Sequence, residues 1–116
     1  MTTQYLDSRT LTERVSIRAR SAGVDAAGQP VDTWTEVAQV WANILNRNGY
    51  ESIKADHDVS VVRASIRIRD RSDITAAMRV VHLRGDAVVA TYEIKAVLPV
   101  QGRRAVDLAC EVIGGN

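Results

Sequence analysis

The sequence predicts a mainly β protein, a small antiparallel β-barrel or sandwich of about six strands with one short helix in the loop between the second and third strands. Two observations carry this prediction. Residues 62–69 alternate apolar and polar side chains without interruption, as a strand does when one of its faces is buried. A long run with two tryptophans follows Gly28 and Pro30, which disfavour a helix at this point.

The chain has room for one domain. Its 116 residues are 46% apolar and 25% charged, which is ordinary for a globular protein. We expect residues 1–12 to form a flexible arm or one short helical turn, and residues 13–116 to form the barrel. The formal net charge of +1 does not favour nucleic acid as a strongly basic domain would. We expect neither a signal peptide nor a membrane span, because no apolar run approaches about 18 residues.

The first two strands are expected around a long loop. The first strand is predicted at residues 14–21, and a loop rich in Gly, Pro and Asp follows over residues 22–33. The second strand is predicted at residues 34–46 and is long enough to project beyond the barrel. Its apolar residues change parity between Val37 and Val40, which predicts a bend or a bulge.

The rest of the chain predicts one short helix and four strands. Residues 50–58 have a helix-compatible composition. Cys110 shares the parity of Val106 and Leu108 in an alternating run, so we expect a small core residue and not a reactive thiol. The later strands are predicted at residues 59–69, 78–83, 88–97 and 104–113.

The two tryptophans are expected to have different roles. Trp34 and Trp41 lie seven residues apart, so on a regular strand they point to opposite faces. We expect Trp41 in the core and Trp34 at an interface, because tryptophan is favoured at buried interface centres.

Arginines line one face of the third predicted strand. Arg63, Arg67 and Arg69 share this face, and Arg18 and Arg20 would extend the basic stripe. Two interpretations stay open: a solvated strand face that resists aggregation, or a surface that faces a neighbouring subunit or DNA.

The sequence predicts no catalytic, cofactor or metal site. The side chains of the run Asp56-His57-Asp58 diverge on a helix or strand, and no second cluster has the spacing of metal ligands. His57 and His82 could join serines in a hydrolytic triad, but no strained nucleophile turn surrounds a serine. The run Arg84-Gly85-Asp86 is expected in a hairpin, where Gly85 supplies a positive φ.

In their order and spacing, the runs at residues 11–17, 62–69, 73–81 and 92–97 resemble the head closure proteins of tailed bacteriophages, also called head-tail joining or adaptor proteins. The resemblance covers roughly residues 11–113, and no single motif in it is a catalytic signature. The segment 82–91 looks a few residues longer than the tight hairpin typical of the family.

This resemblance implies a structural virion protein and not an enzyme. Such a protein docks on the portal or adaptor ring of a DNA-filled head, closes the head and offers a platform to tail-completion proteins. It implies a homo-oligomeric ring in the virion neck after assembly in the host bacterial cytoplasm, transient contact with packaged double-stranded DNA and no membrane partner. In dilute solution we expect a monomer, because no long apolar helix forces association.

The resemblance also implies that the excursion between the second and third strands lies toward the channel as a stopper. In this chain the excursion covers residues 47–58, and its candidate residues are Arg47, Asn48, Gly49, Tyr50, Glu51, Lys54 and His57.

Two alternatives remain. One is a different neck or tail-completion protein, since these small barrels resemble one another. The other, from a different class, is a small barrel that binds single-stranded nucleic acid by stacking bases on aromatic side chains along a basic groove. The chain has an arginine stripe, but only two tryptophans, three tyrosines and no phenylalanine.

Overall fold

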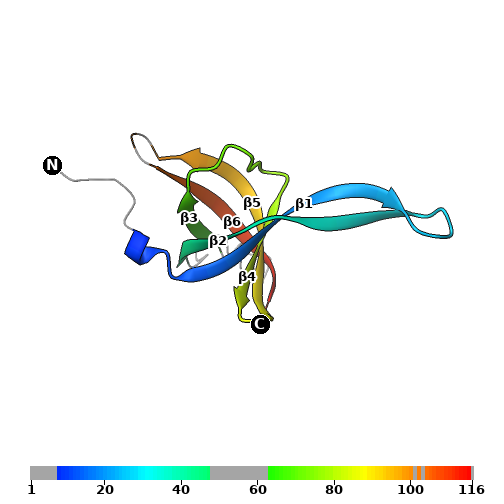
Figure 1. Cartoon of the computed structure of the whole chain (residues 1–116), viewed down its shortest axis with the longest axis horizontal. Helices are drawn as coiled ribbons and strands as arrows, with labels where there is room; N and C mark the ends of the chain where they lie inside the picture. The colour runs from blue at the N-terminus through cyan, green and yellow to red at the C-terminus, as the bar shows by residue number, and fades with distance from the viewer. Residues whose placement is uncertain (1–7, 48–62, 101, 103, 116) are drawn as a thin grey trace, which may run out of the picture.

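The computed structural model describes residues 8–47, 63–100, 102 and 104–115. This part of the chain consists of six strands after one short 3₁₀ turn (Figure 1). The strands β4, β5 and β6 begin and end within two residues of their predicted bounds. The elements are η1 (Ser8–Thr10), β1 (Glu13–Val24), β2 (Pro30–Arg47), β3 (Arg63–Arg69), β4 (Arg79–Arg84), β5 (Ala87–Pro99) and β6 (Ala105–Gly115).

The six strands form one closed antiparallel barrel in the order β1-β2-β3-β6-β5-β4. The last pairing closes it: β1 pairs with β4 from Arg14 opposite Leu83 to Arg18 opposite Arg79. A closed sheet satisfies the backbone groups that an open sheet leaves exposed at its edges. The predicted fold class is therefore confirmed, while the short helix predicted at residues 50–58 lies outside the described residues.

The barrel interior is filled by aliphatic side chains at alternate strand positions. In β3, Ala64, Ile66 and Ile68 are buried, whereas Arg63 and Arg69 point outward, which confirms the predicted alternation. The largest fully buried apolar side chains are Val15, Ile17, Ile66, Ile68, Val80, Ile94, Val106 and Leu108.

Cys110 is one of the inward-pointing residues of β6 and is 2% exposed. Burial raises the pKa of its thiol to about 12, so the side chain stays protonated at neutral pH. The prediction of a core cysteine is confirmed.

The predicted irregularity in β2 is a bulge at Val37. Ile17 pairs with Ala38 and Arg18 pairs with Glu36, so Val37 has no partner on β1. The bulge resets the alternation along β2. After it, Ala42 points into the core and is fully buried, and the neighbouring Trp41 points outward.

Trp41 is 52% exposed, so the prediction that it lies in the core is wrong. The sequence shows that the apolar residues of this strand change parity. It does not show which residues after the change point inward. The interior takes the small Ala42 at this level because large aliphatic side chains from other strands already fill the space.

The prediction of a loop at residues 22–33 is also wrong. Most of this segment continues β1 and β2 as a two-stranded ribbon, with Ser21 opposite Thr33 and Val24 opposite Pro30. This ribbon extends away from the barrel, to the right in Figure 1, so the predicted projection of the second strand is confirmed. We call residues 19–36 the arm, because over these residues β1 and β2 pair only with each other.

A five-residue turn at residues 25–29 closes the arm. The Asp25 carboxylate oxygen Oδ1 accepts hydrogen bonds from the backbone N–H of Ala27 at 2.9 Å and of Gln29 at 2.8 Å. Gly28 has a φ of 82°, a left-handed conformation that favours glycine. The tip of the arm is thus fixed by its own hydrogen bonds, although its residues are exposed.

The turn between β4 and β5 is short. Arg84 pairs with Ala87, and only Gly85 and Asp86 lie between the strands, with Gly85 at a φ of 64°. The predicted role of Gly85 is confirmed. A bulge between His82 and Leu83 shifts the register, so that His82 pairs with Ala90 and Leu83 with Val88.

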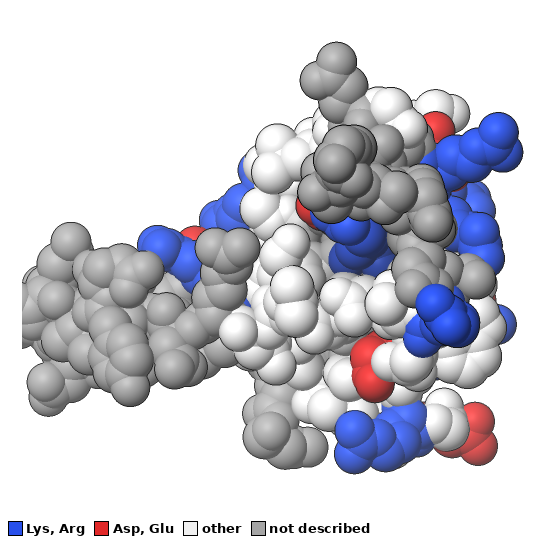
Figure 2. Space-filling view, turned by 90° about the vertical axis from the view of Figure 1, so that its left-hand side faces the viewer, with Lys and Arg blue, Asp and Glu red and all other residues white. Residues whose placement is uncertain are grey.

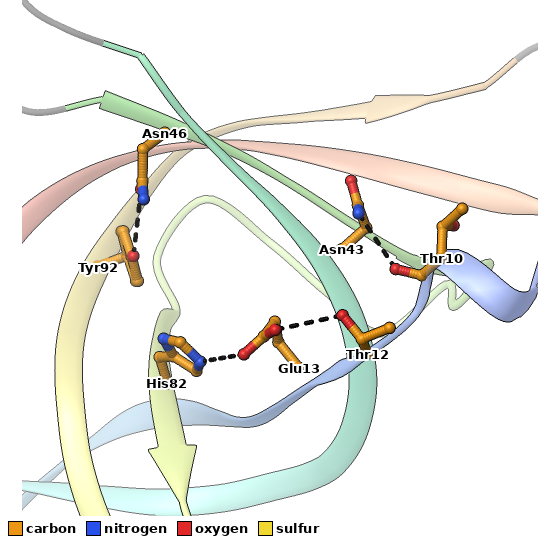
Figure 3. A network of polar contacts seen from close by, with 7 residues as sticks. All are labelled: Thr10, Thr12, Glu13, Asn43, Asn46, His82 and Tyr92. Carbon is orange, nitrogen blue, oxygen red and sulfur yellow. Dashed lines mark hydrogen bonds and ion pairs between the residues drawn. The ribbon is translucent and has the colours of Figure 1, made fainter.

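Polar contacts join the residues before β1 to the barrel (Figure 3). The amide Nδ2 of Asn43 donates to the carbonyl of Thr10 at 3.1 Å, and Leu11 is 8% exposed. Nε2 of the buried His82 lies 2.9 Å from Oε1 of Glu13 and donates to it, because a carboxylate can only accept. This hydrogen bond lowers the pKa of Glu13 below its ordinary value. The flexibility expected for residues 1–12 stays a prediction.

Replacing Ile66 by aspartate should unfold the barrel or destabilise it by several kcal/mol, because Ile66 is 0% exposed and its site offers no partner for a charge. The matched control is Leu45→Asp on the adjacent strand, where Leu45 is 57% exposed. The control should change the free energy of unfolding by no more than about 0.5 kcal/mol. Equal denaturation midpoints for the two variants would show that the register of β3 is wrong.

Glu13→Gln should lower stability in a pH-dependent way. The lowered folded-state pKa of Glu13 stabilises the fold above its ordinary value of 4.5, and this contribution is lost as the pH falls through the folded-state value. At about pH 7 the wild type should be more stable than the variant by about 0.5–1 kcal/mol, and the difference should be smaller at about pH 3.

Chemical denaturation at both pH values measures this difference. Glu93→Gln is the control, since the Glu93 carboxylate pairs with Lys95 at 3.1 Å on an exposed face. An effect of Glu13→Gln that is the same at both pH values would contradict the assigned role of the carboxylate.

Candidate interaction surface

The predicted channel segment joins the ends of β2 and β3. Arg47 is the last residue of β2 and pairs with Arg63, the first residue of β3. The other candidates of this segment lie outside the described residues: Asn48, Gly49, Tyr50, Glu51, Lys54 and His57.

The arginine stripe of β3 is matched by carboxylates on β6. Nε and Nη2 of Arg67 donate to the two carboxylate oxygens of Asp107 at 2.7 and 2.9 Å. These hydrogen bonds raise the pKa of Arg67. Arg63 lies 3.7 Å from Glu111, and Arg69 is exposed. Two of the three arginines are therefore paired, which removes much of the basic character predicted for this face.

Arg18 and Arg20 do not extend this stripe. Arg18 pairs with Glu36 on β2, whereas β3 pairs with the other end of β2, from Asn43 to Arg47. Figure 2 shows one face of the molecule, on which acidic residues lie among basic and uncharged residues. The predicted continuous basic stripe is therefore wrong.

A network of polar side chains on β1 and β2 ends at the exposed ring of Trp41. The Arg14 guanidinium lies 4.8 Å from the centre of the Trp41 ring, and its Nε donates to Oε1 of Gln39 at 3.2 Å. Gln39 and Ser16 donate to Oε2 of Glu36 at 3.2 and 2.6 Å. The hydrogen bond from Ser16, followed by that from Gln39, lowers the pKa of Glu36. The network fixes Arg14 against Trp41, so this exposed aromatic surface is ordered before any partner binds.

Trp34, the predicted interface residue, lies at the base of the arm. The Arg79 guanidinium stacks on its ring, 3.6 Å from the ring centre. Both residues line a cleft with a volume of about 500 Å³. Sequence reasoning missed Arg79, which is 45 positions from Trp34 in the sequence. The two meet because β1 pairs with β2 on one side and with β4 on the other.

A metal-binding cluster is not found among the described residues, and the polar contacts of His82 differ from those of a hydrolytic triad. None of the described residues form a group of three or more His, Cys, Asp or Glu side chains that could hold a metal ion, and the run Asp56-His57-Asp58 lies outside the described range. The Glu13 carboxylate stands between the Thr12 hydroxyl and His82 (Figure 3), whereas a hydrolytic triad places the imidazole in the middle. In the part of the chain that is described, no helix is long and apolar enough to cross a membrane.

Comparison with solved structures shows that other proteins share this fold. The chain is similar to protein SF1141 from Shigella flexneri 2a, known from a solution structure, with a TM-score of 0.66 and 25% sequence identity over 92% of this chain and 96% of that chain. It is also similar to a chain of the virion of a native gene transfer agent particle. There the TM-score is 0.57 and the identity 16%, over 84% of this chain and 90% of that chain, so this likeness concerns the fold alone.

A comparison with curated proteins found no match. The family model for phage head completion proteins matches residues 6–113. This range contains β1 to β5 entirely and most of β6. Because the match covers most of the chain, including the arm and nearly all of the barrel, the chain belongs to the phage head completion protein family.

Proposed function

We propose that this protein docks on the portal or adaptor ring of a DNA-filled phage head, closes the head and forms the platform for tail attachment. The observation that carries this proposal is the family match over residues 6–113, which supports a structural role in the phage head or neck. On this proposal the chain assembles in the host bacterial cytoplasm, becomes part of the virion neck and is not an enzyme.

The surface of the barrel supports a role in assembly. Because the described strands close into a barrel, the barrel leaves few free sheet edges, so its outward side chains and the arm are the surfaces that the described residues offer to other virion proteins. Trp41 and Leu45, which are 52% and 57% exposed, lie on the same outward face of β2. Tryptophan beside arginine is a composition enriched at interface centres, and Arg14 stacks on Trp41.

The charges suit a ring around a DNA channel. Each phosphate that a protein neutralises adds salt-dependent affinity for DNA, which would oppose movement of the genome through the ring. The formal net charge is +1, and Arg67 is already bound to Asp107. In the proposed homo-oligomeric ring, contact with packaged double-stranded DNA is transient, and residues 47–58 face the channel as a stopper.

The alternative of a single-stranded nucleic-acid-binding barrel has less support. Such barrels stack bases on exposed aromatic side chains along an unpaired basic groove. Here Arg63 and Arg67 are paired with carboxylates, and the exposed ring of Trp41 is contacted by Arg14. A different neck or tail-completion protein is a stronger alternative than a nucleic-acid-binding barrel, because it would use the same barrel and the same exposed side chains.

A stop codon in the gene, complemented from a plasmid, tests the proposed role. Without complementation, we expect DNA-filled heads that lack tails or lose their genome, because the head is not closed. Electron microscopy and nuclease-protected DNA measure these outcomes. Wild-type numbers of tailed, DNA-filled particles without the protein would contradict the proposal.

Replacing residues 48–56 by a short Gly-Ser linker tests the stopper role separately. The barrel should stay folded, because a change in loop length costs little closure entropy. Complementation with this variant should give heads that retain less nuclease-protected DNA. The control is the wild-type gene at equal expression, with circular dichroism to confirm the fold of the variant. If the shortened chain restores normal genome retention and infection, residues 47–58 are not a stopper.

A further inference from the structure

The arm has little to stabilise it within one molecule. Residues 20–33 are exposed. Within the arm, β1 and β2 pair with each other and with no other described strand. An isolated two-stranded ribbon is marginally stable in water. The arm nevertheless presents two large apolar side chains at its tip, Val24 at 68% and Val31 at 37% exposure. An ordered, exposed ribbon with an apolar tip has the form of an element that binds a partner.

A cleft at the base of the arm contains a guanidinium group with an unused donor. Nε of Arg79 is buried and has no hydrogen-bond partner among the described residues. Glu93, the cross-strand partner of Arg79, is engaged by Lys95 at 3.1 Å. A buried donor without an acceptor is costly, so the site favours a ligand that brings an acceptor. The stacking of Arg79 on Trp34 fixes the guanidinium in the cleft wall.

We propose that this cleft receives the tip of the arm of a second copy of this chain. The walls of the cleft carry small side chains, among them Ala19, Ala76 and Ala77, and its volume is about 500 Å³. The turn at the tip is also built of small residues, Ala26, Ala27 and Gly28, between the two exposed valines. A narrow turn can enter such a cleft without displacing a large side chain.

The charges of the tip and the cleft are complementary. Residues 21–35 contain Asp25 and Asp32 and neither lysine nor arginine. Asp32 lies 3.6 Å from Arg20 of the same chain, so Asp25 is the acid that the tip offers to a partner. Asp25 uses Oδ1 to fix the turn, and its second oxygen, Oδ2, has no hydrogen bond within the described part of the chain. A carboxylate oxygen is the kind of acceptor that Nε of Arg79 lacks among the described residues. Arginine and tryptophan together are also characteristic of binding hot spots.

The contact must form between molecules. About five residues of extended strand separate Val24 at the tip from Ala19 at the cleft, a distance of roughly 16 Å, so the tip cannot reach the cleft of its own chain. Tip and cleft are different surfaces, and pairing them joins copies head to tail. Repetition of a head-to-tail contact closes a ring where the rotation allows it. The inference rests on the proposed function in this respect, since it supplies the contact between neighbours in the proposed neck ring.

Disulfide trapping with the purified full-length chain tests this contact. One variant carries Ala27→Cys at the tip and another carries Ala77→Cys in the cleft, and Cys110 stays silent because it is 2% exposed with a pKa of about 12. In an oxidised equimolar mixture at high protein concentration, the tip-to-cleft dimer should form about tenfold faster than either homodimer, since a contact of about 1.4 kcal/mol gives this factor. A chain with both substitutions should form a ladder of higher oligomers.

The proposed pairing of Asp25 with Arg79 is tested in the same assay. Arg79→Gln and Asp25→Asn should each slow tip-to-cleft trapping by about threefold or more. Asp86→Asn is the matched control, because Asp86 lies in a tight turn at the other end of β4. Trapping of the mixed pair at the rate of random collision, or trapping that Arg79→Gln leaves unchanged, would overturn the inference and assign the cleft to another partner.

Mass spectrometry of purified particles separates this inference from the proposed function. If the chain is present in the particles but shows no preferential tip-to-cleft trapping, the contact is wrong and the neck role stands. If trapping is preferential but the chain is absent from the particles, the contact stands and the neck role fails.

Discussion

The pairing of β1 with β4 is the constraint on which the rest of the structure depends. It closes the barrel over the short stretch from Arg14 to Arg18 and encloses an interior filled mainly by isoleucine, valine and leucine side chains. Both β1 and β2 are longer than the strands that flank them. Beyond Arg18 they continue without other neighbours, and this excess length is the arm. The bulge at Val37 lies near the point where the arm leaves the barrel, and it turns Trp41 from the core to the surface.

Alternation along single strands could be predicted from the sequence, because it depends only on which residues are apolar. The burial of Ile66 and Ile68 and the inward position of Cys110 followed from this pattern. The prediction for Trp41 is wrong because a bulge changes which alternate residues of a strand point inward. The sequence does not show whether the residues before or after the bulge keep the original orientation. The sequence of the arm indicates a loop, because an exposed ribbon has no buried face and its Gly, Pro and Asp residues resemble those of a turn.

The candidate site depends on contacts between distant parts of the sequence. Arg67 was predicted as part of a basic stripe, but β6 brings Asp107 opposite it and forms a bidentate ion pair. The interface role of Trp34 stays a prediction from the sequence, whereas its stacking on Arg79 could not be predicted, because strand order decides which residues meet across a barrel. The surface that results has balanced charges, an exposed tryptophan and a long arm. These features favour binding to protein neighbours over a firm grip on DNA.

The central claim is that this barrel is a subunit of the virion neck. A reconstruction of the neck by cryo-electron microscopy, from particles that carry the wild-type chain, tests it most directly. We expect a ring of copies between the portal and the tail, with the end of β2 and the start of β3 toward the channel and each arm against the adjacent copy. A neck whose density is fully explained by other proteins, with no ring of this barrel, would show that the chain is not a neck subunit.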